Sequence, residues 1–327
     1  MNKGTIIFRA DGDPTIGMGH FTRTLALAEM LNEQFNCIFA TRQPSEYQIV
    51  EIEKICHGRI DLPEDDSHFE DFLFLLKGDE IVVLDNYYFS TDYQRAIKAK
   101  GCKLVCIDDL HDKHFVADLV INHAPGVDAS VYSKEPNTRL LLGFEHALLR
   151  KVFLQNSEEE KKKYELMIMM GGADPANISE KIIQSVIGQE YNGRIALVKN
   201  SAPGGMRLPD HVGLFHYLSA SEVFRLMRKS TLGIFPSSTT AIEACAARLP
   251  FITGYFVDNQ KSIYHALVEQ ELAYGIGNLQ RCSGEAIVGR AIELMGNQQK
   301  ILSVREKQRQ ALDHKSKERI QQVFLNL

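Results

Sequence analysis

The sequence predicts two doubly wound α/β domains, each built on a mostly parallel β-sheet. Length is the first indication, because 327 residues are too many for one ordinary core and suit two domains of about 150 residues each. Short β-branched runs alternate with helical patterns, which is typical of parallel sheets with helical crossovers. The alternation begins again in the second half without a sequence repeat, so we expect two similar folds rather than a solenoid.

The first half opens with a β-then-α unit, an apolar run at 4–9 followed by a helical stretch from about 21 to 33. Further short apolar runs lie at 36–41, 80–85, 103–108, 117–122 and 138–143, with a helical pattern at 92–100. We therefore expect parallel strands connected by helices in this half.

A charged stretch at 156–164 indicates a solvated helix or linker. We place the domain boundary there, with an N-terminal domain at 1–155 and a C-terminal domain at 156–327. Strand patterns then follow at 164–170, 193–198, 212–217, 231–235 and 250–253, and helical patterns at 177–187, 221–227, 240–247 and 260–269. The tail from about 283 is helical and charged, and we expect the final helix to pack back on the first domain.

Composition excludes several classes of protein. The chain is 44% apolar and 24% charged, as soluble globular proteins are, and no run approaches the roughly 18 apolar residues of a membrane helix. A net charge of −5 gives no electrostatic footprint for nucleic acid. The six cysteines are scattered without zinc-site spacing, which favours reduced thiols. We expect a cytoplasmic monomer that binds neither nucleic acid nor membrane.

A glycine-rich loop at 9–23 joins the first strand to the first helix. Its glycines, Gly12, Gly17 and Gly19, let the backbone turn tightly and approach a ligand at the carboxyl end of the sheet, where open α/β sheets bind substrates. His20 would open the helix, whose positive dipole end favours a neutral imidazole that is available as a base. The alternative is a histidine that only caps or packs. Its place directly after Gly-Met-Gly favours the catalytic role.

The same loop carries Asp11 and Asp13, and spaced carboxylates hold Mg²⁺ or Mn²⁺ in some sugar-transfer enzymes. Such a pair is common by chance, and Mg²⁺ sites usually need substrate phosphates close by. Because we expect the phosphates in the other domain, we predict no metal and no cofactor. Asp11 is then expected to orient the loop or a substrate hydroxyl.

In the second half, Gly171 and Gly172 follow a strand and precede a helix, with Asp174 or Asn177 as the helix cap. This arrangement suits a phosphate. It lacks the three spaced glycines of the dinucleotide fingerprint and the lysine of the P-loop, which argues against NAD and ATP.

A second candidate phosphate site begins where another strand ends. Hydroxyl residues Ser237, Ser238 and Thr239 lead into a helix, and Glu243 lies one turn inside it, where a carboxylate could accept both ribose hydroxyls. The alternative is an ordinary N-cap, which stabilises a helix by about 1 kcal/mol. Polar groups also end strands at 85–88 and 108–111 and precede a helix at 257–262, where turn formation is an equal explanation.

Taken together and in order, these patterns resemble the UDP-2,4-diacetamido-2,4,6-trideoxy-β-L-altropyranose hydrolases of pseudaminic acid biosynthesis. The resemblance runs from about residue 4 to 270. It is carried by Arg9, Asp11, the run 16–20, Arg23, Asp85, Asn86, Tyr87, the run 107–109, Leu142, Gly143, the run 147–150, the run 170–172, Asp174, Ser237, Ser238, Glu243, Asn259, Gln260 and Ser262. Residues 56–77 and those beyond about 275 lie outside it.

The hydrolase family is similar to the MurG-type glycosyltransferases of the GT-B fold. The resemblance therefore implies two Rossmann-like domains facing across a cleft, with UDP bound mainly by the second. It implies His20 as the catalytic histidine and Glu243 as the ribose ligand. The expected substrate-binding residues are Asp11, Gly17, Gly19, Arg23, Tyr87, Asp108 and Asn259, and the expected UDP-binding residues are Gly171, Gly172, Ser237, Ser238, Thr239 and Glu243.

The chemistry that this implies is attack of water on the anomeric carbon of a UDP-sugar. His20 would remove the proton from the water while UDP leaves, which inverts the configuration at that carbon. A glycosyltransferase of the same fold would use the same base on an acceptor hydroxyl. A third alternative is a non-catalytic sensor of nucleotide sugars, which would bind UDP without needing His20.

Overall fold

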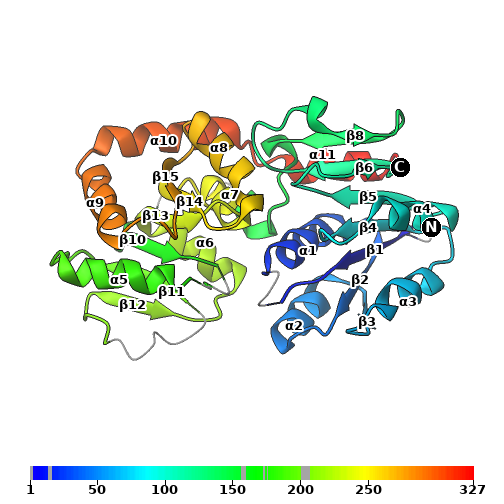
Figure 1. The fold of residues 1–327 in the computed structure, drawn as a ribbon, viewed down its shortest axis with the longest axis horizontal. Helices are drawn as coiled ribbons and strands as arrows, with labels where there is room; N and C mark the ends of the chain where they lie inside the picture. Colours follow the sequence, from blue (N-terminus) through cyan, green and yellow to red (C-terminus); the bar gives the residue numbers. More distant parts are fainter. Residues whose placement is uncertain (1–2, 14–16, 156–159, 172–173, 175, 200–206) are drawn as a thin grey trace. The chain divides into compact units, whose positions relative to one another are not determined.

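A computed structural model describes residues 3–13, 17–155, 160–171, 174, 176–199 and 207–327 (Figure 1). The chain forms two compact units, Met1–Lys151 with Lys315–Leu327, and Val152–His314. Each unit is built on one parallel β-sheet with helical crossovers, so the predicted α/β class with two Rossmann-like sheets is confirmed. The first unit thus ends at Lys151, and the chain returns to it for the last thirteen residues.

The sheet of the first unit has the strand order β3-β2-β1-β4-β5-β7-β9. Its strands are β1 (Thr5–Ala10), β2 (Asn36–Arg42), β3 (Gly58–Leu62), β4 (Ile81–Asp85), β5 (Lys103–Ile107), β7 (Leu119–Asn122) and β9 (Arg139–Leu142), all parallel. The order runs one way from β1 to β3 and the other way from β4 to β9. The strand order therefore reverses between β1 and β4.

Helices of the first unit are α1 (Gly19–Leu31), α2 (Glu46–Ile55), α3 (Ser67–Leu75), α4 (Thr91–Ala99) and α11 (Ser316–Phe324), with short 3₁₀ turns at Ala129–Val131 and Phe144–His146. A third turn, Lys151–Leu154, marks the passage to the second unit. The strands β6 (His114–Phe115) and β8 (Ser133–Lys134) pair beside the main sheet (Figure 1). Serine caps fix two helix starts: Ser45 and Gln48 form a capping box at α2, and Ser90 accepts from the backbone at α4.

The second unit repeats the design with the order β12-β11-β10-β13-β14-β15. Its strands are β10 (Tyr164–Met169), β11 (Ile195–Val198), β12 (Val212–Phe215), β13 (Ser230–Pro236), β14 (Phe251–Tyr255) and β15 (Tyr274–Asn278). Its helices are α5 (Ile178–Gly188), α6 (Ala220–Arg228), α7 (Thr239–Ala246), α8 (Lys261–Glu269), α9 (Gly284–Met295) and α10 (Gln298–Ala311), and Asp258–Gln260 forms a 3₁₀ turn. Here the order reverses between β10 and β13.

The strands that sequence analysis left unassigned lie at sheet edges. β3 carries a charged residue at every second position and only Leu62 is buried, so it lacks the apolar run of the central strands. β15 contains Gly275 and Gly277, and the latter has a φ of +80°. Edge strands need no buried run on both faces, and glycine weakens the strand pattern.

The last helix, α11, packs within the first unit. Phe324 is buried and its ring lies 6.5 Å from that of Phe35, edge to face. Gln321 Nε2 donates to Met30 O at 2.7 Å, at the end of α1. No helix among the described residues is long and apolar enough to span a membrane.

Candidate active site

His20 and Asp85 lie at the point where the strand order of the first sheet reverses. His20 is the second residue of α1, which follows β1, and Asp85 is the last residue of β4, the strand next to β1. Ligands of open α/β sheets bind outside the carboxyl ends of the strands at this switch point. The topology thus brings together two residues that are 65 positions apart in sequence.

Asp85 fixes the orientation of the His20 ring. Nδ1 of His20 lies 2.6 Å from Asp85 Oδ1, and both side chains are buried. An ionised carboxylate only accepts, so Nδ1 carries the proton and donates it to this bond. No described residue hydrogen-bonds Nε2. When the ring is neutral, its lone pair therefore lies on Nε2.

Arg23 keeps Asp85 ionised. Its Nε and Nη2 each donate to Asp85 at 2.7 Å, one to each carboxylate oxygen, and Thr24 Oγ1 adds a bond of 2.8 Å. Burial opposes the charge, but Arg23 and then His20 hold the pKa of the Asp85 carboxyl well below its usual range. Arg23 also donates through Nη1 to Asp109 at 2.7 Å. Arg23, buried between two carboxylates, thus holds in place the Asp85 carboxylate that orients the His20 ring.

Tyr87 covers the other side of the His20 ring. The two rings meet edge to face with centroids 4.5 Å apart, and Tyr87 OH donates to Asp109 Oδ2 at 3.3 Å. The predicted residues His20, Arg23 and Tyr87 therefore form one cluster. Asp85 and Asp109 complete it, and sequence analysis did not include these two carboxylates among the site residues.

Asp11 sits at the centre of a second buried network. One oxygen accepts from Arg9 Nη1 at 2.5 Å, Thr41 Oγ1 at 3.2 Å and the Arg42 backbone at 2.8 Å. The other accepts from Arg9 Nη2 at 3.1 Å, Arg42 Nε at 2.5 Å and Tyr88 OH at 2.5 Å. Its backbone N–H donates to Asn86 at 2.8 Å. Asp11 thus ties β1, β2 and the end of β4 together beneath the loop, and its direct contact with a substrate stays a prediction.

Two glycines of the first loop are required for different structural reasons, Gly12 for space and Gly17 for its backbone conformation. A Cβ at Gly12 would lie 2.8 Å from Cβ of Phe21, so only glycine permits this approach of the loop to α1. Gly17 has a φ of +80° and donates to Asp13 O at 2.8 Å, which closes the loop back on itself before α1 begins at Gly19. Residues 14–16 of this loop lie outside the described residues.

Of the two consecutive aspartates after β5, it is Asp109 that reaches the cluster. Asp108 accepts the backbone N–H of His111 at 3.0 Å, as a turn-forming aspartate does, and burial raises its pKa. A contact of Asp108 with substrate stays a prediction.

His123, at the end of β7, is another residue that the sequence did not single out. It accepts the Leu148 N–H on Nδ1 at 3.2 Å, which places its proton on Nε2, where no described residue accepts it. Burial, then Arg23, lowers the pKa of His123 to about 3, so this ring is neutral across the ordinary pH range.

In the second unit, the turn after β10 lies at the corresponding switch point. Gly171 has a φ of +86°, which glycine adopts without strain. Gly172 lies outside the described residues. Asp174 caps α5, accepting from Ile178 N at 2.8 Å and Ser179 N at 3.1 Å. Asn177 occupies the N-cap position of α5 but its side chain makes no cap bond, so the side-chain capping bonds come from Asp174.

Lys199, directly after β11, is a cation near this turn that sequence analysis missed. It is buried and lies 2.8 Å from Glu180 and 3.9 Å from Asp174. Lys199 thus lies at the carboxyl edge of the sheet beside the predicted phosphate turn, where these two carboxylates balance its charge.

The hydroxyl residues after β13 divide into two groups. Ser237 is fully buried, and its Oγ lies 2.8 Å from Thr253 Oγ1, which itself donates to Phe235 O. That hydroxyl joins β13 to β14. Ser238 is the N-cap residue of α7 but makes no side-chain cap bond, contrary to the ordinary-cap alternative. Ser238 and Thr239 are half-buried, at a helix start whose first N–H groups favour an anion.

Glu243 and Asn259 are placed as follows. Glu243 is buried on the first turns of α7, and Asn259 is half-buried in the 3₁₀ turn before α8. Both belong to the second unit, as do Gly171, Ser237, Ser238 and Thr239. The binding of ribose by Glu243, and of sugar or diphosphate by Asn259, stays a prediction. Among the described residues no group of three or more His, Cys, Asp or Glu is placed to hold a metal ion.

Comparison with known proteins gives relatives of the kind that the motifs indicate. The chain is 28% identical over 272 residues to the UDP-2,4-diacetamido-2,4,6-trideoxy-β-L-altropyranose hydrolase of Campylobacter jejuni, covering 79% of this chain and 93% of that protein. It is 21% identical to the spore coat polysaccharide biosynthesis protein SpsG of Bacillus subtilis, with 97% of each chain covered. The similarity to the hydrolase, expected from the motifs, is confirmed. No family model matches the chain.

Among solved structures, MurG of Acinetobacter baumannii superposes with a TM-score of 0.66 at 12% identity, over 99% of this chain and all of that one. Such a match shows the fold. The two Rossmann-like units therefore have the fold of GT-B glycosyltransferases.

Proposed function

We propose that this chain hydrolyses a UDP-activated deoxy-diacetamido sugar to UDP and the free sugar. The observation that carries the proposal is the His20 and Asp85 pair at the switch point of the first sheet, in which Nδ1 is bound and Nε2 is available. The similarity to the Campylobacter jejuni hydrolase supplies the substrate class.

In the proposed reaction His20 Nε2 takes a proton from water as the water oxygen attacks the anomeric carbon. The bond between that carbon and the β-phosphate oxygen breaks, UDP carries away the electron pair, and configuration inverts. As the ring becomes positively charged, the ionised Asp85 stabilises it. UDP is a good leaving group, so no strong general acid is required.

We assign the nucleotide to the second unit. The start of α7 after Ser238 and the turn at Gly171 offer backbone N–H groups for the diphosphate, and Lys199 lies near that turn. Glu243 is the proposed partner of the ribose. Tyr87, next to His20, and Asn259 are the proposed contacts of the sugar and diphosphate.

We propose that the reaction uses no metal ion. Asp11 is a carboxylate of the first loop that could bind a metal ion, but six donors from the chain already surround its two oxygens. A cation would have to displace the Arg9 and Arg42 side chains. We further propose a cytoplasmic monomer, in keeping with a nucleotide-sugar substrate.

The test is release of UDP from the altropyranose derivative with no acceptor present. We expect turnover that survives EDTA, and a fall of about 10²–10⁴ in His20→Ala with UDP affinity changed by no more than a few-fold. Turnover of a folded His20→Ala variant within about threefold of wild type would remove His20 as the base.

A glycosyltransferase is the second candidate, favoured by the match to MurG. The same base would then deprotonate an acceptor hydroxyl. UDP release that depends on an added acceptor would favour this candidate over the hydrolase.

A further inference from the structure

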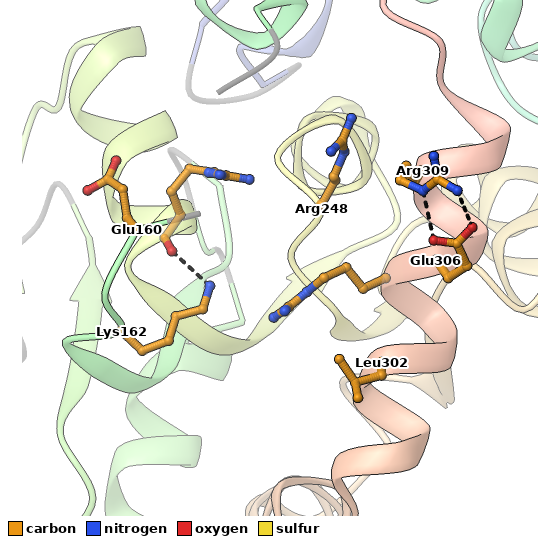
Figure 2. A pocket seen from close by; sticks show the side chains of 8 residues that line it. Glu160, Lys162, Arg248, Leu302, Glu306 and Arg309 are labelled. Atoms are coloured by element: carbon orange, nitrogen blue, oxygen red, sulfur yellow. Dashed lines mark hydrogen bonds and ion pairs between the residues drawn. The ribbon is translucent and has the colours of Figure 1, made fainter. Parts of the chain in front are cut away.

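A cavity of about 220 Å³ in the second unit has charged walls, but its side chains have partners within the chain. Figure 2 shows Lys162 bonded to the backbone of Arg228, and Glu306 bonded to Arg309. The other charged side chains of the lining, Glu160, Arg228, Arg248 and Arg305, also interact within the chain. No ligand is inferred there.

The first unit, by contrast, holds an unpartnered hydrogen-bond donor and an unpartnered acceptor beside the candidate active site. The donor is Nε2 of His123, because Nδ1 accepts from Leu148 N at 3.2 Å. The acceptor is Oδ1 of Asp109, whose Oδ2 accepts from Arg23 and Tyr87. His123 is 2% exposed and Asp109 7%, and no described residue hydrogen-bonds either atom.

The register of the sheet brings these two residues together. Ile107 of β5 is the partner of Ile121 of β7, and Asp109 and His123 each follow two positions later. A backbone bond of 3.0 Å from Asp108 N to Ile121 O continues the pairing past the end of β5. Alternate residues of a strand share a face, so the register places Asp109 and His123 side by side on one face.

The same face carries the cluster around His20. Burial, then the charge of Arg23, lowers the pKa of His123 to about 3, while Asp109 and Asp85 act in the opposite direction. Interactions between charges weaken with distance, so these three groups lie near the His123 ring. The ring is neutral at ordinary pH and donates only through Nε2.

A buried polar atom without a partner costs about 1–3 kcal/mol, and one ligand group could satisfy both of these atoms. A hydroxyl fits, because it accepts from an N–H and donates to a carboxylate at the same time. A trans amide fits less well, because its N–H and C=O point in opposite directions and cannot meet a donor and an acceptor that lie side by side.

We propose that His123 and Asp109 bind the free ring hydroxyl of the substrate sugar. Nε2–H of His123 donates to the hydroxyl oxygen, and the hydroxyl donates to Asp109 Oδ1. The inference rests on the proposed function. In a 2,4-diacetamido-2,4,6-trideoxy sugar, carbons 2 and 4 carry acetamido groups, carbon 6 carries no oxygen and the oxygen of carbon 1 is bonded to UDP, so the 3-hydroxyl is the one that remains. This contact would select sugars that bear it.

The test compares kcat and KM of the wild type, His123→Asn and His123→Gln with the UDP-sugar. The asparagine oxygen takes the place of Nδ1 and keeps an acceptor for Leu148 N–H, but the donor at Nε2 is lost. We expect kcat/KM to fall by about tenfold or more, mainly through KM, with UDP affinity unchanged.

His123→Gln is the matched control, because its amide N–H takes the place of Nε2 while Leu148 N–H loses its acceptor. This variant should keep kcat/KM within about threefold of wild type and show the larger loss in urea unfolding, about 1–3 kcal/mol. A purely structural His123 predicts the reverse order of activities.

The 3-deoxy analogue of the UDP-sugar shows whether the hydroxyl is the partner. The wild type should use it about tenfold less efficiently or worse, whereas His123→Asn should use the two sugars within about threefold of each other, because the contact is already lost. A hydroxyl can bond either end of an amide, so Asp109→Asn would keep a contact and the test varies His123 instead.

The failures of the two proposals differ. If the wild type releases no UDP from the parent sugar, the proposed function fails and the hydroxyl contact fails with it. If the wild type hydrolyses both sugars equally well, or the analogue loses as much in His123→Asn as in the wild type, the contact alone is refuted and Nε2 bonds water only. If His123→Asn does not fold, the comparison of the two sugars in the wild type still decides: a loss of about tenfold supports the contact, and a loss under about twofold refutes it.

Discussion

Asp85 joins three residues at the start of α1, His20 among them. Four donors from α1 converge on its two oxygens: His20 Nδ1, Arg23 Nε and Nη2, and Thr24 Oγ1. Only the bond to His20 bears directly on the proposed base. The bonds to Arg23 keep the carboxylate charged and in place.

Asp85→Asn should therefore lower turnover by about 10² or more with UDP affinity changed by no more than a few-fold. An amide offers His20 an oxygen without charge or an N–H where an acceptor is needed, so the imidazole loses its fixed tautomer and the stabilisation of its charged form. Steady-state kinetics and UDP calorimetry measure the two effects.

Asp109→Asn is the matched control, because Asp109 binds Arg23 but not His20. We expect its loss of turnover to be smaller by about tenfold. Equal losses in the two variants would mean that Asp85 acts only by holding Arg23.

The Asp11 network makes a prediction about stability. Removing one partner of a buried ion pair costs about 3–5 kcal/mol, so Asp11→Asn should lower the free energy of unfolding by that amount. Asp61→Asn is the control. It breaks a pair with the same spacing, Arg59 and Asp61, at an exposed position and should cost under about 1 kcal/mol. Urea unfolding distinguishes them, and similar losses would contradict the network's importance.

The same network predicts the sign of the pH dependence. Burial opposes the charge of Asp11, but Arg9 holds the pKa of its carboxyl well below the ordinary 3.8, and the pKa of Asp85 is displaced in the same direction. A depressed pKa contributes stability that is present above the unfolded value and is lost as pH falls through the folded one. The free energy of unfolding should fall below about pH 4, and less steeply in Asp11→Asn.

How far the site could be predicted from sequence differs from residue to residue. The glycine spacing pointed to His20 because local motifs carry it. Its partner Asp85 lies 65 residues away, and only the strand order brings the two together. Asp109 was missed in favour of Asp108 because adjacent residues after a strand point in different directions, and the pattern does not say which one faces the site.

At the scale of elements, the central strands and the edge strands β9 and β12 were predictable, but the edge strands β3 and β15 were not. β1, β4, β10 and β13 carry buried runs that the sequence displays, whereas β3 and β15 are edge strands with charged residues or glycines. Helix α7 shows that residue type alone does not predict a capping bond. A serine before a helix predicts one, but the Ser238 side chain makes none.

Because α7 presents Glu243 one turn inside its start, Glu243→Ala should weaken UDP binding by about 1.5–3 kcal/mol, or roughly 10–150-fold. Glu222→Ala on α6 provides a comparison, since that carboxylate belongs to a capping box and should leave UDP affinity unchanged. Calorimetry with UDP measures both. Unaltered affinity in a folded Glu243→Ala variant would return Glu243 to a structural role within α7.

At the scale of the whole molecule, the same winding occurs twice. Each sheet reverses its order next to its first strand. His20, Asp85, Gly171 and Ser238 lie at the ends of the two strands on either side of that reversal, β1 and β4 in one unit and β10 and β13 in the other. The alternation of strands and helices predicted the winding. The proposed division of labour, with water activation in the first unit and nucleotide binding in the second, determines which bond of the substrate breaks.

Hydrolysis in H₂¹⁸O tests that claim most directly, because attack on the sugar carbon and attack on the β-phosphorus give the same two products. If His20 directs water to the anomeric carbon while UDP leaves intact, mass spectrometry will find the label in the free sugar and none in UDP. Attack on phosphorus would call for a metal or a cationic clamp around the diphosphate. Lys199, the cation that the described residues place beside Asp174 of this turn, is itself paired with Glu180. Label in the β-phosphate of UDP would contradict the account.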